Sequence, residues 1–152
     1  MFEGRIVKEE IDINKVVKNI IARTYGEGAG ALVVFIGYVK GVVEGHTVNE
    51  LDYQAYEPYA TKKLQEIINE EKEDGVLSIV VYHRVGDLKP GEPTIYVFVS
   101  ALDRTKAFEK ARRILERVKH EVPIFKLEKR DDGEYWVLGD KNRVKREKKE
   151  KK

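Results

Sequence analysis

The sequence predicts one α+β domain with a mostly antiparallel sheet and three main helices. Three stretches with helical periodicity alternate with short apolar or alternating stretches, and several of these follow one another directly, as hairpin strands do. The chain has 152 residues, 41% of them hydrophobic, which suits one domain with its own core. We expect residues 1–140 to form a single catalytic domain and residues 141–152 a basic tail that is flexible, or helical only against a partner.

The first half of the chain is expected to begin with an edge strand at residues 5–11. Asp12 is a suitable N-cap for a helix at residues 13–25, whose apolar side chains recur on one face. After a glycine-rich loop, residues 31–39 are apolar almost throughout, which indicates a central strand buried on both faces. Residues 48–56 alternate in polarity and could pair antiparallel with the strand before them.

Proline and glycine bound the elements of the second half. Pro58 suits the first turn of a second helix, and Pro123 ends the third and longest one. Asp131-Asp132-Gly133 is typical of a hairpin turn. The expected elements are a helix at 58–72, strands at 76–83 and 94–101, a helix at 105–122, and strands at 124–129 and 134–137.

The composition excludes several kinds of site. Without cysteine, the chain cannot form disulfides, thiolate metal sites, a cysteine nucleophile or a persulfide. His46, His83 and His120 are far apart and lack the spacing of a zinc motif, so we expect neither a metal nor a cofactor. No stretch approaches the ~18 apolar residues of a membrane span, and the first ten residues do not resemble a signal peptide, so the expected location is the cytoplasm.

Charge is distributed unevenly along the chain. Residues 141–152 contain eight Lys or Arg and two Glu, a charge of +6, so the remainder carries −4 in a chain of net charge +2. A basic tail of this kind allows salt-dependent nucleic-acid binding, which is one alternative function. The tail has no aromatic residue for stacking on bases, and the body is acidic, which argues against that alternative.

Two lysines lie on either side of the end of the third helix, and the helix end, the turn at Pro123 and the start of the next strand could bring both to one cleft. Lys119 lies four residues after Leu115 and three before Val122, beside the apolar stripe. It is either a snorkelling lysine near a helix C-terminus or a partly desolvated one, whose lowered pKa would let it act as acid, base or nucleophile. Lys126 follows on a short strand, where we expect Phe125 and Leu127 to face the core and Lys126 and Glu128 the other side.

Further cations lie near predicted strand ends. Arg104 opens the third helix, and a helix N-terminus beside an arginine can bind an anion. The simpler interpretation is that Asp103 caps the helix and Arg104 is solvated. Lys40 ends the strand at residues 31–39, where ligand contacts often collect. We interpret His83 as structural, because no serine–histidine–acid order or carboxylate pair accompanies it.

Several motifs together resemble the catalytic (large) subunit of molybdopterin synthase, over about residues 5–138. The motifs are Phe35-Ile36-Gly37, Val39-Lys40, Leu51-Asp52-Tyr53, Ala55-Tyr56-Glu57-Pro58, Val81-Tyr82-His83-Arg84-Val85-Gly86-Asp87-Leu88, Pro90-Gly91-Glu92, Val99-Ser100-Ala101, Arg104, Ala107-Phe108-Glu109, Val118-Lys119 and Pro123-Ile124-Phe125-Lys126.

The resemblance implies an α/β-hammerhead fold and a homodimer. It also implies that each subunit receives a small ubiquitin-like sulfur carrier with a C-terminal Gly-Gly thiocarboxylate. Two sulfurs would pass in turn to cyclic pyranopterin monophosphate and form the dithiolene of molybdopterin. The absence of cysteine fits this expectation independently, because a chain that cannot hold the sulfur needs a partner to deliver it.

Carried over position by position, the resemblance implies that Lys119 and Lys126 are catalytic and that Lys40 and Arg104 hold the substrate phosphate. Glu128 would lie in the same pocket. The family usually has arginine where Lys40 stands. It usually has His-Arg directly after the Ser-Ala, whereas here Leu102-Asp103 precede Arg104, an apparent one-residue insertion that places Asp103 beside the phosphate position. Lys141 or Arg143 could serve as the family's C-terminal arginine, which reaches the neighbouring subunit. A third alternative is a non-catalytic scaffold that only binds the carrier.

Overall fold

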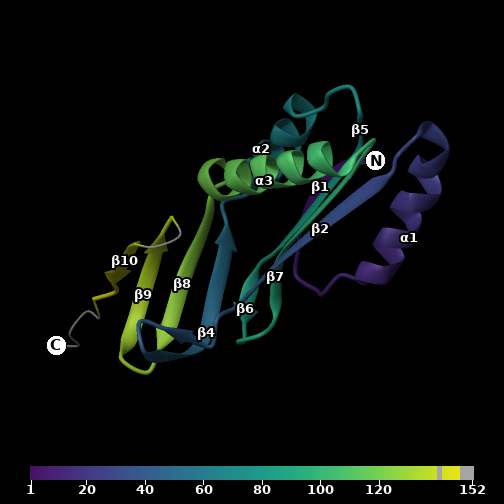
Figure 1. The fold of residues 1–152 in the computed structure, drawn as a ribbon. Helices are drawn as coiled ribbons and strands as arrows, with labels where there is room; N and C mark the ends of the chain where they lie inside the picture. Colours follow the sequence, from purple (N-terminus) through teal and green to yellow (C-terminus); the bar gives the residue numbers. More distant parts are fainter. Residues whose placement is uncertain (140–141, 148–152) are drawn as a thin grey trace.

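The chain forms two sheets, and helices cover one of them on both faces (Figure 1). The computed structural model describes residues 1–139 and 142–147. The elements in chain order are β1 Phe2–Val7, α1 Ile13–Thr24, η1 Tyr25–Glu27, β2 Ala31–Tyr38, β3 Val42–Val43, β4 His46–Ala55, α2 Tyr59–Glu70, β5 Val76–Arg84, β6 Gly86–Leu88, β7 Pro93–Ala101, α3 Arg104–Glu121, β8 Ile124–Arg130, β9 Gly133–Leu138 and β10 Asn142–Lys145. The α+β class, the three main helices and the mostly antiparallel pairing are therefore confirmed.

The first sheet has the strand order β1-β5-β7-β2, with β1 parallel to β5 and the other pairs antiparallel. Its central strands carry large apolar side chains on both faces. Val81 and Val97 pack in the core beneath α2 and α3, whereas Tyr96 and Phe98 pack in a second core beneath α1. Figure 1 shows α1 on one side of the sheet and α2 and α3 on the other.

The strand β2 lies at the edge of this sheet, so the expectation of a central strand is wrong. Its side chains are nevertheless partly buried on both faces, because Val33 and Phe35 pack toward α3 and Val34 and Ile36 toward α1. An apolar run reports that both faces of a strand are covered. It does not indicate whether the strand pairs with one neighbouring strand or with two.

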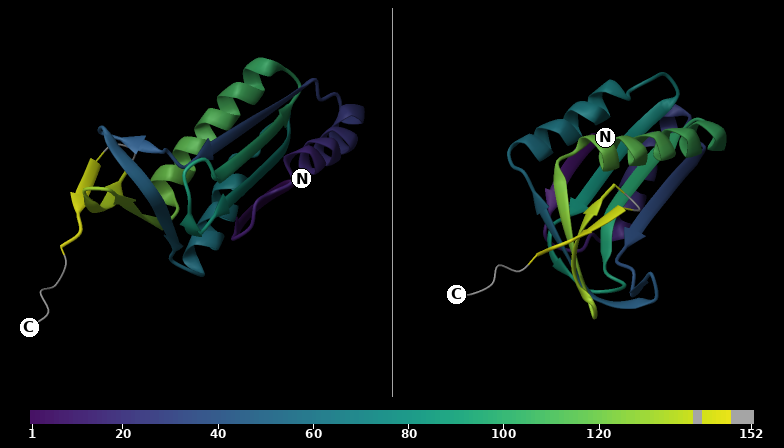
Figure 2. Two further views of the ribbon diagram at one scale, coloured as in Figure 1. Left: turned by 90° about the horizontal axis from the view of Figure 1, so that it is seen from below. Right: turned by 90° about the vertical axis from the view of Figure 1, so that its left-hand side faces the viewer.

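The second sheet has the order β10-β9-β8-β4-β3, and β6 also pairs with β4. The expected pairing of residues 48–56 with the strand at 31–39 is therefore wrong. A register shift at Gly37/Tyr38 interrupts β2, and the tight β3–β4 turn has positive φ at Glu44 (53°) and Gly45 (78°). These features send β4 into the second sheet, which extends away from the helices in the views of Figure 2.

Two further boundaries differ from expectation. The first strand begins at Phe2 and not at residue 5, because its ladder with β5 runs from Phe2 opposite Ile79 to Val7 opposite Arg84. Asn142–Lys145 form β10 on the edge of β9, so the expectation of a flexible or helical tail is wrong for these residues. Lys141 and residues 148–152, which complete the expected tail, lie outside the described residues, and the boundary at residue 140 stays a prediction.

Helix starts and helix packing fix the orientation of α3. Asp103 Oδ1 accepts a hydrogen bond of 2.9 Å from the backbone N–H of Lys106, as expected of an N-cap. Glu71, which is 5% exposed at the end of α2, accepts hydrogen bonds from Lys110 (3.0 Å) and Arg117 (2.9 Å) of α3. This buried carboxylate ties the two helices together. In the described part of the chain, no helix is long and apolar enough to cross a membrane.

Candidate active site

A pocket of about 210 Å³ opens where the two sheets meet the C-terminal end of α3. Its wall combines residues from nearly every part of the chain, including the end of β2, the strands β4, β5, β7, β8 and β9, the helix α3 and the strand β10. The charged side chains of the wall are Lys40, Lys119, Lys126, Arg143 and Glu128. Four cations against one carboxylate make this pocket suitable for an anionic ligand.

Lys119 and Lys126 both line this pocket, as the sequence predicted. Lys119 is an exposed residue in the last turn of α3, beside the buried Val118. Lys126 is half-buried on β8, opposite Tyr53 of β4, and its Nζ lies 5.6 Å from the centroid of the Tyr53 ring. The end of the helix and the start of the strand thus bring two ammonium groups to one cavity.

The neighbours of Lys126 only partly follow expectation. Leu127 is buried at 4% exposure, and Glu128 faces the pocket with Lys126. Phe125 is 55% exposed, so the expectation that it faces the core is wrong. Phe125 lies just before the β8–β9 ladder, which starts at Lys126 opposite Val137.

Glu128 is almost fully buried, with 3% exposure, and is held by arginine. Arg143 of β10 donates from Nε to Oε1 at 2.9 Å and from Nη2 to Oε2 at 3.2 Å. Arg130 adds a longer ion pair of 3.7 Å. The two-pronged pair with this buried carboxylate fixes Arg143 in the wall of the pocket of its own chain.

Two aromatic residues form part of the pocket wall next to Lys126. The rings of Tyr53 and His83 meet edge to face at a centroid distance of 5.3 Å. Burial, together with the positive charges of Lys126 and Lys119, lowers the pKa of His83 to about 4, against the opposing effect of its bond to the Arg84 carbonyl. Burial raises the pKa of Tyr53 to about 12. Both side chains are therefore uncharged near neutral pH.

Sequence reasoning did not include Tyr53, His83 or Thr94 in the site, although all three line the pocket. The position of His83 near the end of a strand, just before Gly86, was the available signal. That signal alone does not distinguish a histidine packed in the core from one that lines a pocket, because either can occur at the end of a buried strand.

Asp103 and Arg104 lie at the opposite end of α3 from Lys119. Fifteen residues of helix separate Arg104 from Lys119, which corresponds to about 22 Å along the axis. Both residues are exposed, and neither lines the pocket. Within a single chain Arg104 therefore does not share the crevice of the two lysines, its role in holding the phosphate stays a prediction, and Asp103 acts as the helix cap.

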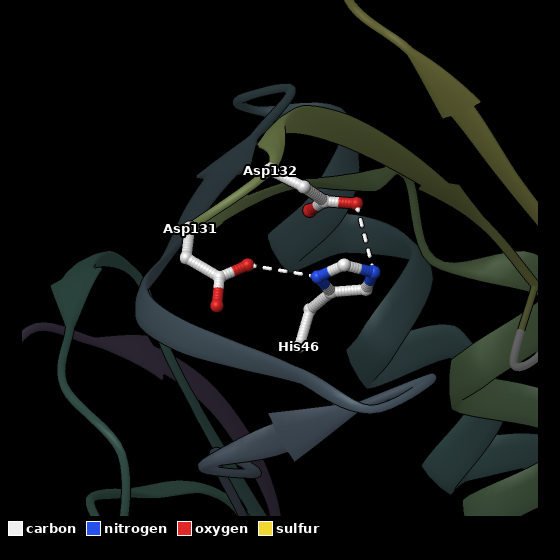
Figure 3. A group of neighbouring side chains, drawn as sticks. All are labelled: His46, Asp131 and Asp132. Carbon is white, nitrogen blue, oxygen red and sulfur yellow. Dashed lines mark hydrogen bonds and ion pairs between the residues drawn. The ribbon is translucent and has the colours of Figure 1, made fainter.

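One group of the described residues could offer three metal ligands, at the far end of the second sheet. Figure 3 shows the ring of His46 between two carboxylates, with Nδ1 2.9 Å from Asp131 Oδ1 and Nε2 3.4 Å from Asp132 Oδ2. The two ring nitrogens point in different directions, so one ion cannot replace both contacts. Arg130 also binds both oxygens of Asp132 at 2.9 Å. We interpret the group as an ion-paired link between β4 and the β8–β9 turn.

The fold and the pocket define a class of α+β protein with a lysine-lined pocket at the end of its longest helix. The sequence model of the MoaE protein family matches residues 6–121. A molybdopterin synthase catalytic subunit from Pyrococcus abyssi is 37% identical over 138 residues, covering 90% of this chain and 92% of the relative. The chain therefore belongs to the MoaE protein family, and the resemblance inferred from the sequence is confirmed.

Solved structures share the fold. The crystal structure of molybdopterin synthase from Staphylococcus aureus matches with a TM-score of 0.77 and 34% identity, covering 88% of this chain and 95% of that one. A protein–protein complex of subunits 1 and 2 of the molybdopterin-converting factor from Helicobacter pylori matches with a TM-score of 0.72 over 90% of this chain and 91% of that one. At its 20% identity, the second match concerns the fold alone.

Proposed function

We propose that this chain is the catalytic subunit of a molybdopterin synthase. In this proposal it transfers sulfur from the thiocarboxylate of a small ubiquitin-like carrier to cyclic pyranopterin monophosphate. The observation that carries the proposal is the convergence of Lys119 and Lys126 in one cation-lined pocket, in a chain of the MoaE family. Because the chain has no cysteine, the sulfur must arrive on a partner.

The roles follow from the position of each side chain. Lys119, at the rim of the pocket, acts as general acid and base while the carrier sulfur adds to the pterin side chain. Lys126, deeper in the pocket beside Tyr53, stabilises the negative charge that develops. Lys40 orients the phosphate from the end of β2, with Arg143 held nearby by Glu128. Each transfer leaves the carrier as a carboxylate, with an oxygen from water in place of the sulfur.

The carrier is the expected partner of this pocket. A flexible Gly-Gly terminus is narrow enough to enter a small cavity, and its anionic end matches the surrounding lysines. The solved Helicobacter pylori complex, which has this fold, contains two subunits of a molybdopterin-converting factor. We infer that this chain assembles with a carrier of that kind.

A second copy of this chain accounts for Arg104. The edge of β2 has no partner strand among the described residues, and such an edge can pair with its own copy. The Ala31 end of β2 lies beside Ala101, near the start of α3, while the other end leads into Lys40 and the pocket. Antiparallel pairing about a twofold axis would bring Arg104 of one copy to the pocket of the other.

The size of the pocket supports this arrangement. About 210 Å³ in one chain is below the range of roughly 300–1,000 Å³ that is common for small-molecule sites. A wall contributed by a second copy would enlarge the site and add a cation for the phosphate. In this arrangement Asp103 keeps its role as the cap of α3 and fixes the direction in which the helix presents Arg104.

A reconstituted assay tests the function. The purified chain is mixed with thiocarboxylated carrier and the pterin precursor, and dithiolene formation is followed. We expect Lys119→Ala to abolish product and Lys126→Ala to reduce it by at least about a hundredfold, while both variants remain folded. Near-normal turnover of the Lys119 variant would contradict the proposal. Carrier binding without any product from the unmodified chain would favour the non-catalytic scaffold.

Nucleic-acid binding through the basic tail gains no support from the described residues. Arg143 is bound to Glu128, and Arg146 lies 3.2 Å from Glu134. Cations that are already paired with carboxylates of the same chain contribute less to the release of counterions on binding a phosphate backbone.

A further inference from the structure

A hydrogen bond to a backbone carbonyl fixes the tautomer of the buried His83 ring. The residue is 6% exposed, and its Nδ1 lies 2.7 Å from the carbonyl oxygen of Arg84. A carbonyl oxygen only accepts hydrogen bonds, so Nδ1 must carry the proton. Because the ring is neutral, Nε2 is then an unprotonated acceptor with a lone pair.

The surroundings of this acceptor are unusual. His83 lies in the wall of the same pocket as Lys119 and Lys126, and the positive charges of both lysines act on its ring. Tyr53 adjoins both His83 and Lys126: its ring lies edge to face with His83 at a centroid distance of 5.3 Å, and Lys126 Nζ lies 5.6 Å from its centroid. Three strands, β4, β5 and β8, thus bring a tyrosine, a neutral imidazole and a lysine together.

We propose that His83 is a positioning residue for the two lysines, and that the lone pair of its Nε2 is the acceptor available to the ammonium group of Lys126 in the pocket. Arg84 sets the tautomer through its backbone carbonyl, and Tyr53 fixes the plane of the ring. Three strands have a defined part in this arrangement: β5 supplies the acceptor, β4 the aromatic contact and β8 the ammonium group.

The chemical consequence concerns the charge of Lys126. A lone pair available to an ammonium group favours its protonated form, which offsets the repulsion from Lys119. A positively charged Lys126 is what the stabilisation of a developing negative charge requires. The effect on turnover rests on the proposed function, whereas the effect on the lysine itself does not.

Two substitutions separate this role from a purely structural one. In His83→Asn the side-chain amide replaces Nδ1 and can still donate to the Arg84 carbonyl, but it leaves nothing at the position of Nε2. In His83→Gln the longer side chain places an amide oxygen near the position of Nε2 and gives up the bond to Arg84. Our proposal predicts that Gln is the better replacement. A structural role through the Arg84 carbonyl predicts that Asn is better.

The first readout is the pH dependence of acylation of Lys126 by acetic anhydride, measured residue by residue with mass spectrometry and with the exposed Lys18 as internal reference. We expect His83→Asn to move the midpoint for Lys126 down by about half a pH unit or more, and His83→Gln to keep it near the unsubstituted value. Equal midpoints in all three proteins, or a shift in the Gln variant alone, would overturn the proposal. This measurement needs neither carrier nor pterin.

The second readout is turnover in the reconstituted assay. We expect kcat to fall about tenfold in His83→Asn and no more than about threefold in His83→Gln, with KM for the carrier little changed in either variant. If sulfur transfer is absent from the unsubstituted chain while the acylation midpoints behave as expected, the proposed function fails and the positioning role stands.

A measurement on the unsubstituted histidine covers the case in which a His83 variant does not fold. Long-range ¹H–¹⁵N spectra report the protonation and hydrogen bonding of each imidazole nitrogen. We expect an unprotonated Nε2 whose resonance moves when Lys126 is replaced by Met. A protonated Nε2, or a resonance that is the same with and without the Lys126 side chain, would contradict the proposal.

Discussion

Arg143 and Glu128 form a two-pronged ion pair that ties the last described strand to the wall of the pocket, with contacts of 2.9 and 3.2 Å. The pair joins β10 to β8 across β9, so the position of β10 and the shape of the pocket wall depend on each other. The resemblance implied that an arginine here reaches the neighbouring subunit. In this chain Arg143 lies in the pocket of its own chain.

Replacement of Arg143 by Ala is therefore expected to affect both stability and substrate binding. Glu128 would keep only the longer contact with Arg130, so we expect a loss of about 1–3 kcal/mol in the free energy of unfolding and a higher KM for the pterin. Urea unfolding and steady-state kinetics measure the two effects. Arg146→Ala is the matched control, because its pair with Glu134 is more exposed, and it should cost less than about 0.5 kcal/mol. Equal losses in both variants would contradict this account.

The buried Glu71 predicts a specific dependence of stability on pH. Burial opposes its ionisation, but hydrogen bonds from Arg113, Lys110 and Arg117 outweigh burial and lower the pKa of Glu71 to about 2. Since the folded-state pKa is lower than in the unfolded chain, the stabilisation is present above about pH 5 and is lost as the pH falls toward 2. We expect Glu71→Gln to cost about 2–3 kcal/mol at pH 7 and much less at pH 3.

Urea unfolding of the Glu71 variant at the two pH values measures this difference. The control is Glu66→Gln, which removes an exposed carboxylate of α2 whose pair with Lys63 spans 3.5 Å. Its cost should stay below about 1 kcal/mol at both pH values. A cost for Glu71→Gln that does not depend on pH would show that the helix pair is not held by this charge.

Complementation tests whether Arg104 serves the pocket of a second copy. Lys119→Ala and Arg104→Ala chains should each have little activity alone. Random mixing after unfolding and refolding makes half of the dimers mixed, and one of the two sites in each mixed dimer is intact. We therefore expect recovery of about a quarter of the unsubstituted activity. If the mixture is no more active than the separate variants, Arg104 and Lys119 do not act across two copies.

Lys40 is expected to act on substrate binding more than on chemistry. Lys40→Ala should raise KM for the pterin about tenfold, with kcat within about threefold, because the phosphate is bound similarly in the ground and transition states. Lys40→Arg should keep or lower KM, since guanidinium binds phosphate with two parallel hydrogen bonds. Steady-state kinetics with both variants measures this. A loss confined to kcat would place Lys40 in the chemical step.

The sequence predicted the positions of helices and strands better than it predicted which strands pair. The apolar run at residues 31–39 correctly indicated burial of both faces, but its place at the sheet edge depends on which strands pair, and hydrophobicity does not encode pairing. The strand β10 was missed because Asn142–Lys145 is almost entirely polar. Its order comes from the ladder with β9 and from the ion pairs of Arg143 with Glu128 and of the following Arg146 with Glu134, partners that lie 15 and 12 residues earlier in the chain.

At the candidate site, too, local spacing predicted some features, whereas others depend on the tertiary structure. Helical spacing placed Lys119 beside the apolar stripe, and the helix stop at Pro123 indicated that Lys126 returns to the same place. The length of α3 is enough to show, from the sequence alone, that Arg104 and Lys119 lie far apart within one chain. The state of His83 could not be predicted, because it depends on burial and on one backbone carbonyl.

The most direct test of the central claim uses a carrier whose thiocarboxylate is labelled with heavy sulfur. The labelled carrier is mixed with this chain and cyclic pyranopterin monophosphate, and the pterin product is analysed by mass spectrometry. We predict a product that contains two labelled sulfur atoms with the unsubstituted chain and none with Lys119→Ala. A doubly labelled product formed at the same rate by the Lys119 variant, or a pterin that gains no label from the unsubstituted chain, would contradict the account.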